Sequence, residues 1–406
     1  MGAICIIGLG RVGLPLSLSF CKAGYTVYGM DKDKELIEKL QKGVMPFMEK
    51  GAGELLRRYH NKTFLPSLNN IEKLKDSQTI IITLGTPVDE HLNPDYSQID
   101  NILPLLSKNL QKNHLIILRS TISPGTTEYI KDILEKETKL KCGSDFFLAF
   151  CPERIAEGNA LEEIEEIPQI IGGIDTISSK KAEEIFSNIT NECLITDAKS
   201  AELAKIFTNM YRYINFAIAN EFTILSMQHK KDIYEITNLI NHNYKRGGLA
   251  LPGFSAGPCL YKDGYFLLNN VPFNELISAS WRINENLPIY LINEVKQKIN
   301  LKNKKAVILG MSFKKNIDDQ RNSLSFKIKK TLIREQCEVF CQDPFIKEYN
   351  LNYEETLKDA DLLIIGVNHD VYKNLNIEYL KTKVKENCIV CDIWNILKTG
   401  KIIFNI

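Results

Sequence analysis

The spacing of apolar residues changes twice along the chain. Up to about residue 198, short apolar runs alternate with longer segments in which apolar residues recur every three or four positions. The short runs predict buried strands, and the periodic segments predict amphipathic helices. Strands are expected at 3–7, 26–30, 79–84, 114–118, 145–149 and 169–171, with a helix at 12–23. This alternation predicts a parallel sheet with helices on both faces.

A second pattern begins near residue 200. Apolar residues recur at helical spacing from 200 to 230 without a proline, through Leu203, Ile206, Phe207, Met210, Ile214, Ala217 and Ile218, which predicts one long helix. Another helix is expected from Pro272 to about Ile299, with Trp281 on its apolar face. Pro288 is expected to kink or break that helix.

Strand-like runs then return at 306–309, 338–342, 361–367 and 388–393. The chain is therefore predicted to be an α/β protein with two doubly wound, Rossmann-like domains joined by a long central helix. The expected domains are 1–198, 199–300 and 301–406.

The composition of the chain argues against nucleic-acid binding, membrane association and secretion. The chain has 406 residues, 44% of them hydrophobic, and its 51 Lys and Arg residues balance its 50 Asp and Glu residues. A balanced charge gives no reason to expect a nucleic acid or an anionic membrane as partner. The apolar runs are too short to cross a bilayer, and the N-terminus reads directly into a strand rather than into a signal peptide. We expect a cytoplasmic protein with its ten cysteines reduced.

The cysteine spacing gives little support for a metal site. The close pairs are Cys337/Cys341 and Cys388/Cys391, and the second pair lies in a predicted strand, where residues three apart point to opposite faces. A zinc site also needs a second ligand pair of suitable spacing. We therefore expect no metal and interpret most of these cysteines as small buried hydrophobes.

A glycine-rich turn follows the first strand. In Gly8-Leu9-Gly10-Arg11-Val12-Gly13, the first two glycines allow a tight turn and close approach of a pyrophosphate, and Gly13 lets the helix pack on the strand. Asp31 ends the second strand, where a carboxylate accepts hydrogen bonds from a ribose 2′-hydroxyl and repels a 2′-phosphate. The pattern predicts binding of NAD rather than NADP; the alternative is a tight turn that binds nothing.

Two further loops follow predicted strands, at the sheet edge where open α/β sheets bind ligands. Gly85-Thr86-Pro87 follows one strand, and the segment from Ser120 through Thr121 to Thr127 follows the next. Thr121 is the candidate for reaching the nicotinamide or a catalytic water. The commoner role of serine and threonine at such a position is to cap the following helix.

Two candidate catalytic groups lie further along the chain. Glu153, beside Arg154, follows a predicted strand and is a candidate for activating water; a salt bridge to Arg154 or a place at a helix start is the alternative. Lys205 and Asn209 share one face of the long helix, where a cation and an amide can stabilise an oxyanion. The alternative for Lys205 is an ammonium that extends to solvent.

The most informative residue is Cys259. It follows the small-residue segment Ala256-Gly257-Pro258, and Lys262 and Asp263 come three and four residues later. Nearby positive charge raises the thiolate fraction of a cysteine. A nicotinamide enzyme needs no thiol to make a carbonyl, but it needs one to continue to an acid through a thioester.

Taken together, these residues resemble the UDP-glucose/GDP-mannose dehydrogenase family, whose members oxidise nucleotide sugars at C6. The resemblance covers nearly the whole chain and runs in order through the Gly8 loop with Pro15, the 85–87 and 120–121 loops, Pro152-Glu153, the helix at 201–209, the segment 257–263, and Ser312-Phe313-Lys314 with Asp319 and Arg321. Any one of these segments is modest evidence, and all of them in order are specific.

The resemblance implies a role for each matching residue. Cys259 is the nucleophile, Lys205 and Asn209 steady the oxyanion, and Glu153, Asp263 and Thr121 organise the water. Lys314 and Arg321 lie near the sugar and phosphates, and Arg154 and Gly257 belong to the substrate site. Arg246 aligns with an arginine supplied across a dimer interface with the central helix at its core. The implied reaction consists of two successive hydride transfers to NAD. The second leaves the sugar bound to the cysteine as a thioester, which water then hydrolyses.

The chain departs from the glucose-type pattern at Arg154 and at the loop 256–258. An arginine at position 154 is similar to members that take UDP-N-acetylhexosamines, since its guanidinium offers a rigid set of donors. UDP-ManNAc or UDP-GlcNAc is the expected substrate, with a uronic acid precursor of surface polysaccharide as product. UDP-glucose is the first alternative.

Two other functions compete with this interpretation. A single-step β-hydroxyacid or 6-phosphogluconate-type dehydrogenase shares the first domain and the lysine-bearing helix, but it needs neither Cys259 nor a second doubly wound domain. A non-catalytic nucleotide-sugar sensor is expected to have lost the nucleophile or Lys205, and this chain has both.

Overall fold

The computed structural model describes residues 2–68, 71–267 and 273–406. The chain forms two compact units, of which the first is Met1–Thr208 with a short segment from Tyr265, and the second is Asn209–Gly264 with the chain from Val271 to its end. The chain passes from one unit to the other within helix α9, Ala198–Gln228. The three-part division expected from the sequence stays a prediction.

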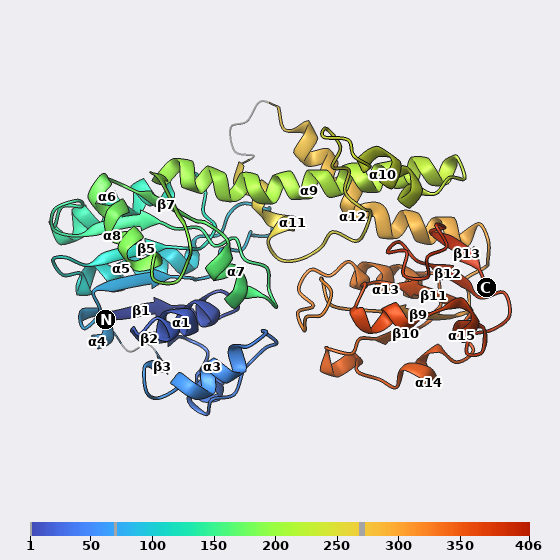
Figure 1. Ribbon diagram of the computed structural model, residues 1–406, viewed down its shortest axis with the longest axis horizontal. Coiled ribbons are helices and arrows are strands. Elements are labelled where there is room, and N and C mark those ends of the chain that lie inside the picture. Colours follow the sequence, from blue (N-terminus) through green and yellow to red (C-terminus); the bar gives the residue numbers. More distant parts are fainter. Residues whose placement is uncertain (1, 69–70, 268–272) are drawn as a thin grey trace. The chain divides into compact units, whose positions relative to one another are not determined.

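The first unit contains an eight-stranded sheet with the order β3-β2-β1-β4-β5-β6-β7-β8 (Figure 1). Its strands are β1 Ala3–Ile7, β2 Thr26–Asp31, β3 Phe64–Leu68, β4 Thr79–Ile82, β5 Leu115–Leu118, β6 Phe147–Phe150, β7 Gln169–Gly173 and β8 Cys193–Asp197. The six strands named from the apolar runs are all present. The order reverses between β1 and β4, where an open α/β sheet leaves a crevice for its ligand.

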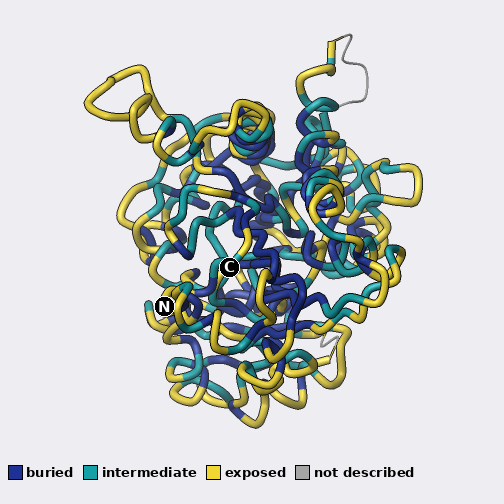
Figure 2. The backbone as a smooth tube through the Cα atoms, turned by 90° about the vertical axis from the view of Figure 1, so that its right-hand side faces the viewer, coloured by how far each residue is buried: buried dark blue, intermediate teal, exposed yellow. Residues whose placement is uncertain are grey.

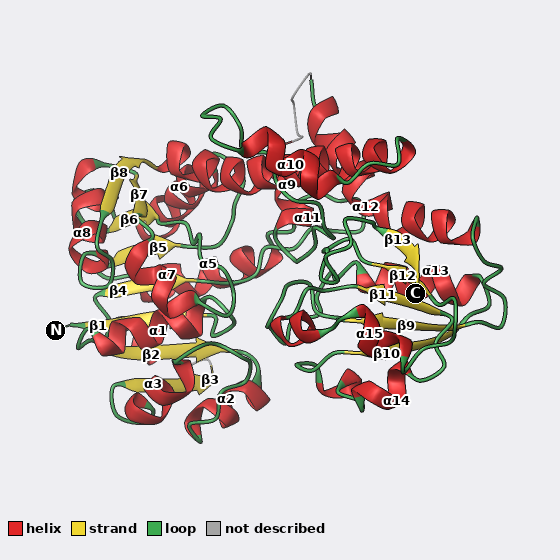
Figure 3. Ribbon diagram, turned by 45° about the vertical axis from the view of Figure 1, so that its right-hand side comes forward, coloured by secondary structure: helices red, strands yellow, loops and turns green. Residues whose placement is uncertain are grey.

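Helices cover both faces of this sheet, as Figure 3 shows with helices in red and strands in yellow. One apolar core contains Ile4 and Ile6 of β1, and the other contains Cys5 and Ile7, because successive strand residues point to opposite faces. The helices of this unit are α1 Gly13–Lys22, α2 Lys34–Gln41, α3 Ala52–Tyr59, α4 Glu72–Lys75, α5 Ser97–Asn109, α6 Thr126–Thr138, α7 Ala160–Glu166 and α8 Thr176–Phe186.

The sheet differs from the prediction at its edges. Strands β3 and β8 were not predicted, since β3 carries Pro66 and β8 has an exposed Leu194 and Ile195 instead of a buried run. The strands pair in parallel as predicted, except that β7 pairs antiparallel to β6, which the sequence did not predict. The connection between them passes through α7.

The second unit contains a five-stranded sheet with the order β10-β9-β11-β12-β13. Its strands are β9 Lys305–Leu309, β10 Glu338–Gln342, β11 Leu362–Ile365, β12 Ile389–Cys391 and β13 Ile403–Asn405. The first four strands were predicted, and β13, which pairs antiparallel with β12, was not. Two apolar cores cover its two faces. Figure 2 colours the backbone by burial, with buried residues in dark blue and exposed residues in yellow.

The long helices of the middle segment are α9, α10 Ile233–Asn241 and α12 Glu275–Lys296. Helix α12 continues through Pro288 and so does not break there, and Trp281 is buried on it as expected. Its predicted start at Pro272 lies outside the described residues. Shorter helices are α11 Leu260–Asp263, α13 Ser325–Arg334, α14 Tyr353–Leu357 and α15 Ile377–Lys381, with 3-10 turns at Gly264–Leu267, Lys347–Tyr349 and Asp370–Asn374.

The apolar residues of α9 are not all buried. Phe207 and Ile218 belong to the periodic pattern that predicted the helix, yet 55% and 37% of their surfaces are exposed. Across residues 2–68, 71–267 and 273–406, no helix combines the length and the apolar character needed to span a bilayer.

Candidate active site

The glycine turn after β1 has the geometry that the sequence predicts. Gly8 has a φ of 98°, and a Cβ there would lie 2.9 Å from the Thr83 carbonyl oxygen. A Cβ on Gly13 would lie 1.8 Å from the Gly8 carbonyl oxygen, so only glycine lets α1 start this close to the turn. A Cβ on Gly10 would meet no atom within 4 Å. This open space beside a helix start fits a dinucleotide pyrophosphate.

Asp31 lies at the end of β2, beside this turn. One oxygen of its carboxylate accepts a hydrogen bond of 2.7 Å from the Leu9 backbone N–H, and the other accepts one of 3.0 Å from Asp33. These bonds fix the carboxylate beside the glycine turn. A carboxylate held there fits a ribose 2′-hydroxyl.

Arg11, inside the turn, points toward a different loop. Its guanidinium lies 3.6 Å from a Glu157 carboxylate oxygen and 4.8 Å from the centre of the Phe47 ring. The neighbouring Val12 is the residue at which α1 begins.

The two loops expected at the sheet edge are joined to each other. The Thr86 hydroxyl donates to the Thr121 carbonyl oxygen at 2.6 Å, and the Ser120 hydroxyl donates to the Leu84 carbonyl oxygen at 2.5 Å. Thr86 and Thr121 are both buried. Pro87 follows directly, and its carbonyl oxygen accepts a hydrogen bond from Asp95.

Glu153 and Lys205 form an ion pair in the first unit. The Lys205 ammonium lies 3.8 Å from one Glu153 carboxylate oxygen, and the two side chains are 6% and 12% exposed. The other Glu153 oxygen is buried and has no hydrogen-bond partner among the described residues. Lys205 therefore does not extend to solvent, and among the described residues Glu153 forms its salt bridge with Lys205 rather than with Arg154. Arg154 instead donates to the Pro168 carbonyl oxygen.

Sequence reasoning missed two residues that fix the Glu153 segment. Arg119 is buried and donates to the Cys151 carbonyl oxygen at 3.2 Å and to Gln169 at 2.8 Å. The Gln169 amide donates to the Pro152 carbonyl oxygen at 3.0 Å. Burial lowers the pKa of Arg119, while the negative charge of Glu153 opposes that shift. The sequence contained one signal for Arg119, because a charged residue that directly follows a buried strand usually needs a partner.

In the second unit, Cys259 immediately precedes α11 and is exposed. All ten cysteines lie in described residues, and each of the other nine is buried or half-buried. Burial raises the pKa of Cys5 and Cys388 to about 12 and that of Cys142 to about 11. Cys259 is thus the thiol best placed to meet a substrate.

Asp263 is the fully buried centre of a polar group beside Cys259 in the chain. Its carboxylate accepts a hydrogen bond of 2.6 Å from the Asn209 amide and one of 2.9 Å from the Lys262 ammonium. The Asp263 backbone N–H also donates to the Cys259 carbonyl oxygen. The structure therefore brings together three of the predicted site residues, Cys259, Asp263 and Asn209.

The segment after β9 packs against the loop that leads to Cys259. Gly257 has a φ of 113°, and a Cβ there would lie 2.8 Å from the Phe313 ring. Lys314 follows Phe313, and its carbonyl oxygen accepts a hydrogen bond from the Ser312 hydroxyl. Arg321 donates to both carboxylate oxygens of the buried Asp319. The shorter bonds are to Oδ2, at 2.9 Å from Nε and 2.6 Å from Nη2 of Arg321.

Arg246 lies in the exposed segment after α10, with its guanidinium 5.2 Å from the centre of the Tyr244 ring. The described residues contain no group of three or more His, Cys, Asp or Glu side chains arranged to hold a metal ion.

Comparison with known proteins identifies the family. Three family models of the UDP-glucose/GDP-mannose dehydrogenase family match in order: the NAD binding domain over residues 2–190, the central domain over 199–286 and the UDP binding domain over 307–399. The chain belongs to this family. It is an NAD-dependent nucleotide-sugar dehydrogenase, which confirms NAD as the cofactor and the family resemblance drawn from the sequence.

Similar proteins extend over nearly the full chain. A UDP-N-acetyl-D-mannosamine dehydrogenase of Pyrococcus horikoshii is 33% identical over 403 residues, covering 97% of this chain and 96% of the relative. One of Methanocaldococcus jannaschii is 32% identical over 97% of this chain and 92% of the relative. The solved structure of the UDP-D-ManNAc dehydrogenase from P. horikoshii matches with a TM-score of 0.89 at 32% identity, over 94% of this chain and 93% of that one. The two-domain α/β fold is confirmed.

Proposed function

We propose that this chain oxidises the C6 hydroxyl of a UDP-N-acetylhexosamine, most specifically UDP-ManNAc, to a carboxylate through a thioester on Cys259. The observation that carries the proposal is the exposure of Cys259 beside the Asn209–Asp263–Lys262 group, while the other nine cysteines are buried or half-buried. The similar UDP-N-acetyl-D-mannosamine dehydrogenases support the choice of sugar.

The proposed reaction balances in four steps. When bound, NAD would accept one hydride, so the two oxidations consume two NAD molecules, and NADH is exchanged for a second NAD between them. In the first, the C6 alcohol loses a hydride and a proton and becomes an aldehyde. The Cys259 thiolate adds to the aldehyde carbon, giving a thiohemiacetal whose loss of a second hydride leaves a thioester. Water then adds to the thioester carbon and the thiolate leaves, giving the carboxylate.

The polar residues have separate tasks in this scheme. The Lys205 ammonium and the Asn209 amide stabilise the oxyanion that forms at C6. Glu153, with one buried oxygen lacking a hydrogen-bond partner among the described residues, accepts a proton from the attacking water with Thr121 and Asp263 as orienting groups. The Lys205 ammonium, 3.8 Å from one Glu153 carboxylate oxygen, holds the Glu153 side chain in place beside the reacting carbon.

Further residues bind the substrate in this proposal. Lys314 and Arg321 bind the phosphates and sugar, and Gly257, whose missing side chain lets the Phe313 ring approach, shapes the substrate site before Cys259. Arg154 donates one bond to the Pro168 carbonyl oxygen and keeps further N–H groups for the acetamido group. The product is a uronic acid precursor of a surface polysaccharide, made in the cytoplasm, where cysteines stay reduced.

We further propose a homodimer built on α9, in which Arg246 reaches the partner's substrate. Four apolar side chains on one face of α9 support this proposal, since all are more than a third exposed: Tyr211, Ile218, Phe222 and Leu225.

The deciding experiment measures NADH formed per limiting sugar nucleotide, with excess NAD and with UDP-ManNAc, UDP-GlcNAc, UDP-GalNAc, UDP-glucose and GDP-mannose in turn. Two NADH per UDP-ManNAc, with the other sugars slower, is the expected result. If UDP-glucose alone gives two NADH per sugar, the substrate is UDP-glucose and not UDP-ManNAc. One NADH in a reversible reaction would contradict the thioester, and no turnover at all would favour a nucleotide-sugar sensor.

A further inference from the structure

One carboxylate of the first unit has no part in the proposed chemistry, although it lies one helical turn from Lys205. Glu202 is 1% exposed on α9. Its carboxylate accepts three hydrogen bonds: one of 2.6 Å from the Gly125 N–H, one of 2.8 Å from the Thr127 N–H and one of 2.5 Å from the Thr127 hydroxyl. A buried carboxylate is costly unless it is hydrogen-bonded, so these bonds explain why it is tolerated.

These donors belong to the first turn of α6. The first N–H groups of a helix have no partner within the helix and are usually satisfied by a capping side chain. The capping position of α6 is Gly125, with a φ of 94° and no side chain to offer. The cap comes instead from Glu202, on another helix. Burial raises the pKa of Glu202, and the hydrogen bonds from Thr127 and Gly125 oppose that rise.

The same bonds fix one end of the loop that carries Ser120 and Thr121. At the other end, the loop is held by the bonds of Ser120 to Leu84 and of Thr86 to Thr121. In the middle, the Ser123 N–H donates to the Tyr96 hydroxyl at 2.7 Å.

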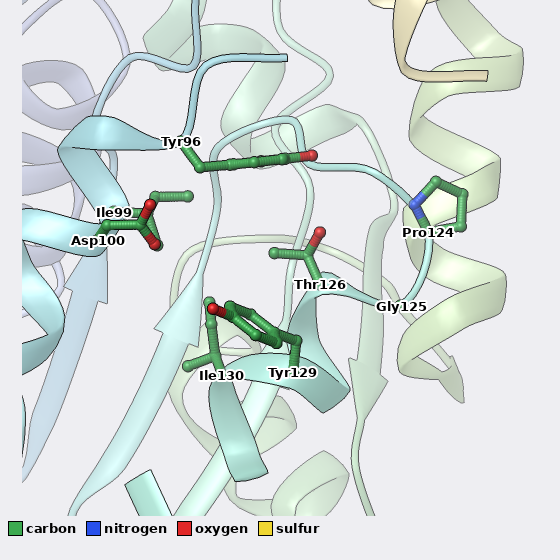
Figure 4. Close-up of a pocket in the computed structure, with 8 residues that line it drawn as sticks. All are labelled: Tyr96, Ile99, Asp100, Pro124, Gly125, Thr126, Tyr129 and Ile130. Carbon is green, nitrogen blue, oxygen red and sulfur yellow. The ribbon is translucent and has the colours of Figure 1, made fainter. Parts of the chain in front are cut away.

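Packing does little to hold this loop on its α5 side. A cavity of about 400 Å³ lies there, and Tyr96, Pro124, Gly125 and Thr126 are among the residues that line it. Figure 4 shows Tyr96 on one side of this space and the 124–126 segment with Tyr129 on the other. Ile122 is buried in an apolar core, but on the side of the loop that borders the cavity there are fewer atoms in contact, so the hydrogen bonds contribute to holding a single conformation there.

We propose that Glu202 is a positioning residue, which fixes the Thr121 loop to the helix that carries Lys205. The inference rests on the proposed function, because it assumes that Thr121 and Lys205 act in the reaction. A carboxylate suits this role, since both of its oxygens accept and neither donates. An amide at the same place would direct an NH₂ group at a backbone N–H, and a shorter acid would not reach the helix.

The test compares Glu202 with a carboxylate of the same bonding pattern elsewhere in the unit. Asp175 accepts hydrogen bonds from the Ile177 and Ser178 N–H groups and from the Ser178 hydroxyl, at the start of α8. It follows β7, which runs antiparallel to β6, so it lies at the sheet edge away from the Thr121 loop. D175N is thus the matched control for E202Q, and S178A is the control for T127V.

Four readouts together separate positioning from folding. Hydrogen exchange of residues 121–127 in the enzyme without ligands should become faster in E202Q and T127V, and stay unchanged in D175N and S178A. The kcat should fall about 10- to 100-fold in E202Q and less in T127V, because misplaced catalytic groups cost rate even when binding is intact. The KM for the UDP-sugar should change less than about threefold. The melting temperature should fall in both E202Q and D175N.

Two results would overturn the role of Glu202. An E202Q enzyme with wild-type kcat, or a D175N enzyme with the same loss of kcat, overturns it. If E202Q does not fold, T127V decides, since wild-type exchange and kcat in that variant also overturn the inference. K205M separates the two proposals: an active K205M enzyme contradicts the proposed function, whereas an inactive one beside a normal E202Q removes only the role of Glu202.

Discussion

At the scale of single residues, the ten thiols of this chain differ in reactivity because they differ in burial. Alkylation requires the thiolate, and burial disfavours that charged form. Burial raises the pKa of Cys21 to about 12 and that of Cys337 to about 11, whereas Cys259 is exposed.

Iodoacetamide at pH 8 is therefore expected to modify Cys259 first and to abolish sugar oxidation as it does so. Peptide mapping by mass spectrometry measures the order of modification. The C259S variant serves as control and should take up label only slowly. Equal labelling of the buried cysteines in the folded enzyme would contradict the prediction.

Gly10 and Gly13 give a second prediction, because the turn needs them for different reasons. In G13A the new Cβ meets the Gly8 carbonyl, so we expect a loss of about 1–3 kcal/mol in unfolding free energy. In G10A the new Cβ meets no protein atom within 4 Å, so stability should be unchanged. NAD affinity should nevertheless fall at least about tenfold, since the Cβ occupies the space of the pyrophosphate. Thermal unfolding and NAD titration measure the two effects, and wild-type affinity in G10A would show that the backbone approaches no phosphate there.

The sequence predicted which residues carry the chemistry better than how they are held. Three residues stand out by their position: Asp31 at the end of a strand, Lys205 on an apolar helix, and Cys259 after a segment of small residues. The pairing of Lys205 with Glu153 joins residues far apart in the chain, and the use of Glu202 as a cap for α6 depends on how two helices pack. Local spacing contains neither fact.

At the scale of elements, the interior strands were predictable, whereas of the edge strands only β10 was predicted. Strands such as β4 and β5 are buried on both faces, which makes them continuous apolar runs. The edge strands β3, β8 and β13 have one side of their backbone without a neighbouring strand and need fewer apolar residues. The antiparallel entry of β7 was missed because apolar runs carry no direction.

Asp361, directly before β11, joins several elements of the second unit. Its carboxylate accepts hydrogen bonds from the Lys304 and Lys385 ammonium groups, at 3.3 and 2.9 Å, and from the Lys305 N–H at 2.9 Å. Burial alone would raise the pKa of Asp361, but the bonds from Lys385, Lys305 and Lys304 outweigh it, so the pKa is lowered.

A lowered pKa in the folded state means that Asp361 stabilises the fold above its unfolded-state pKa. That contribution is lost as the pH falls through the folded-state pKa. D361N should thus lower the unfolding free energy by about 1–3 kcal/mol at pH 7 and show a shallower decline in acid than the wild type. Denaturant unfolding from pH 7 to pH 3 measures this. E348Q, at an exposed glutamate of the same unit, is the control, and a parallel decline in D361N and wild type would refute the role of Asp361.

At the scale of the whole molecule, the exposed apolar face of α9 predicts self-association. Phe222 is 42% exposed and Leu225 is 47% exposed on a helix whose other faces are packed. F222D should convert a dimer to a monomer in sedimentation velocity, because a buried unpaired charge is strongly unfavourable at an interface. I333D places the same charge at an exposed isoleucine of α13 and should leave the dimer intact. A monomeric wild type, or a dimeric F222D, would exclude this face as the interface.

The strand order of the first sheet has a consequence for how the chain folds. Neighbours such as Val27 and Phe64, or Thr79 and Leu115, are close in sequence, whereas the β1–β4 pair joins Ile4 to Thr79. Closing that longest loop costs the most chain entropy, so β3-β2-β1 and β4 to β8 form two local nuclei that join last along one seam. In pulse-labelling hydrogen exchange during refolding, the amides bonded across β1 and β4 should gain protection after those within either half. The seam that completes last is also the place where the strand order reverses, so the dinucleotide crevice is the final part of this sheet to exist.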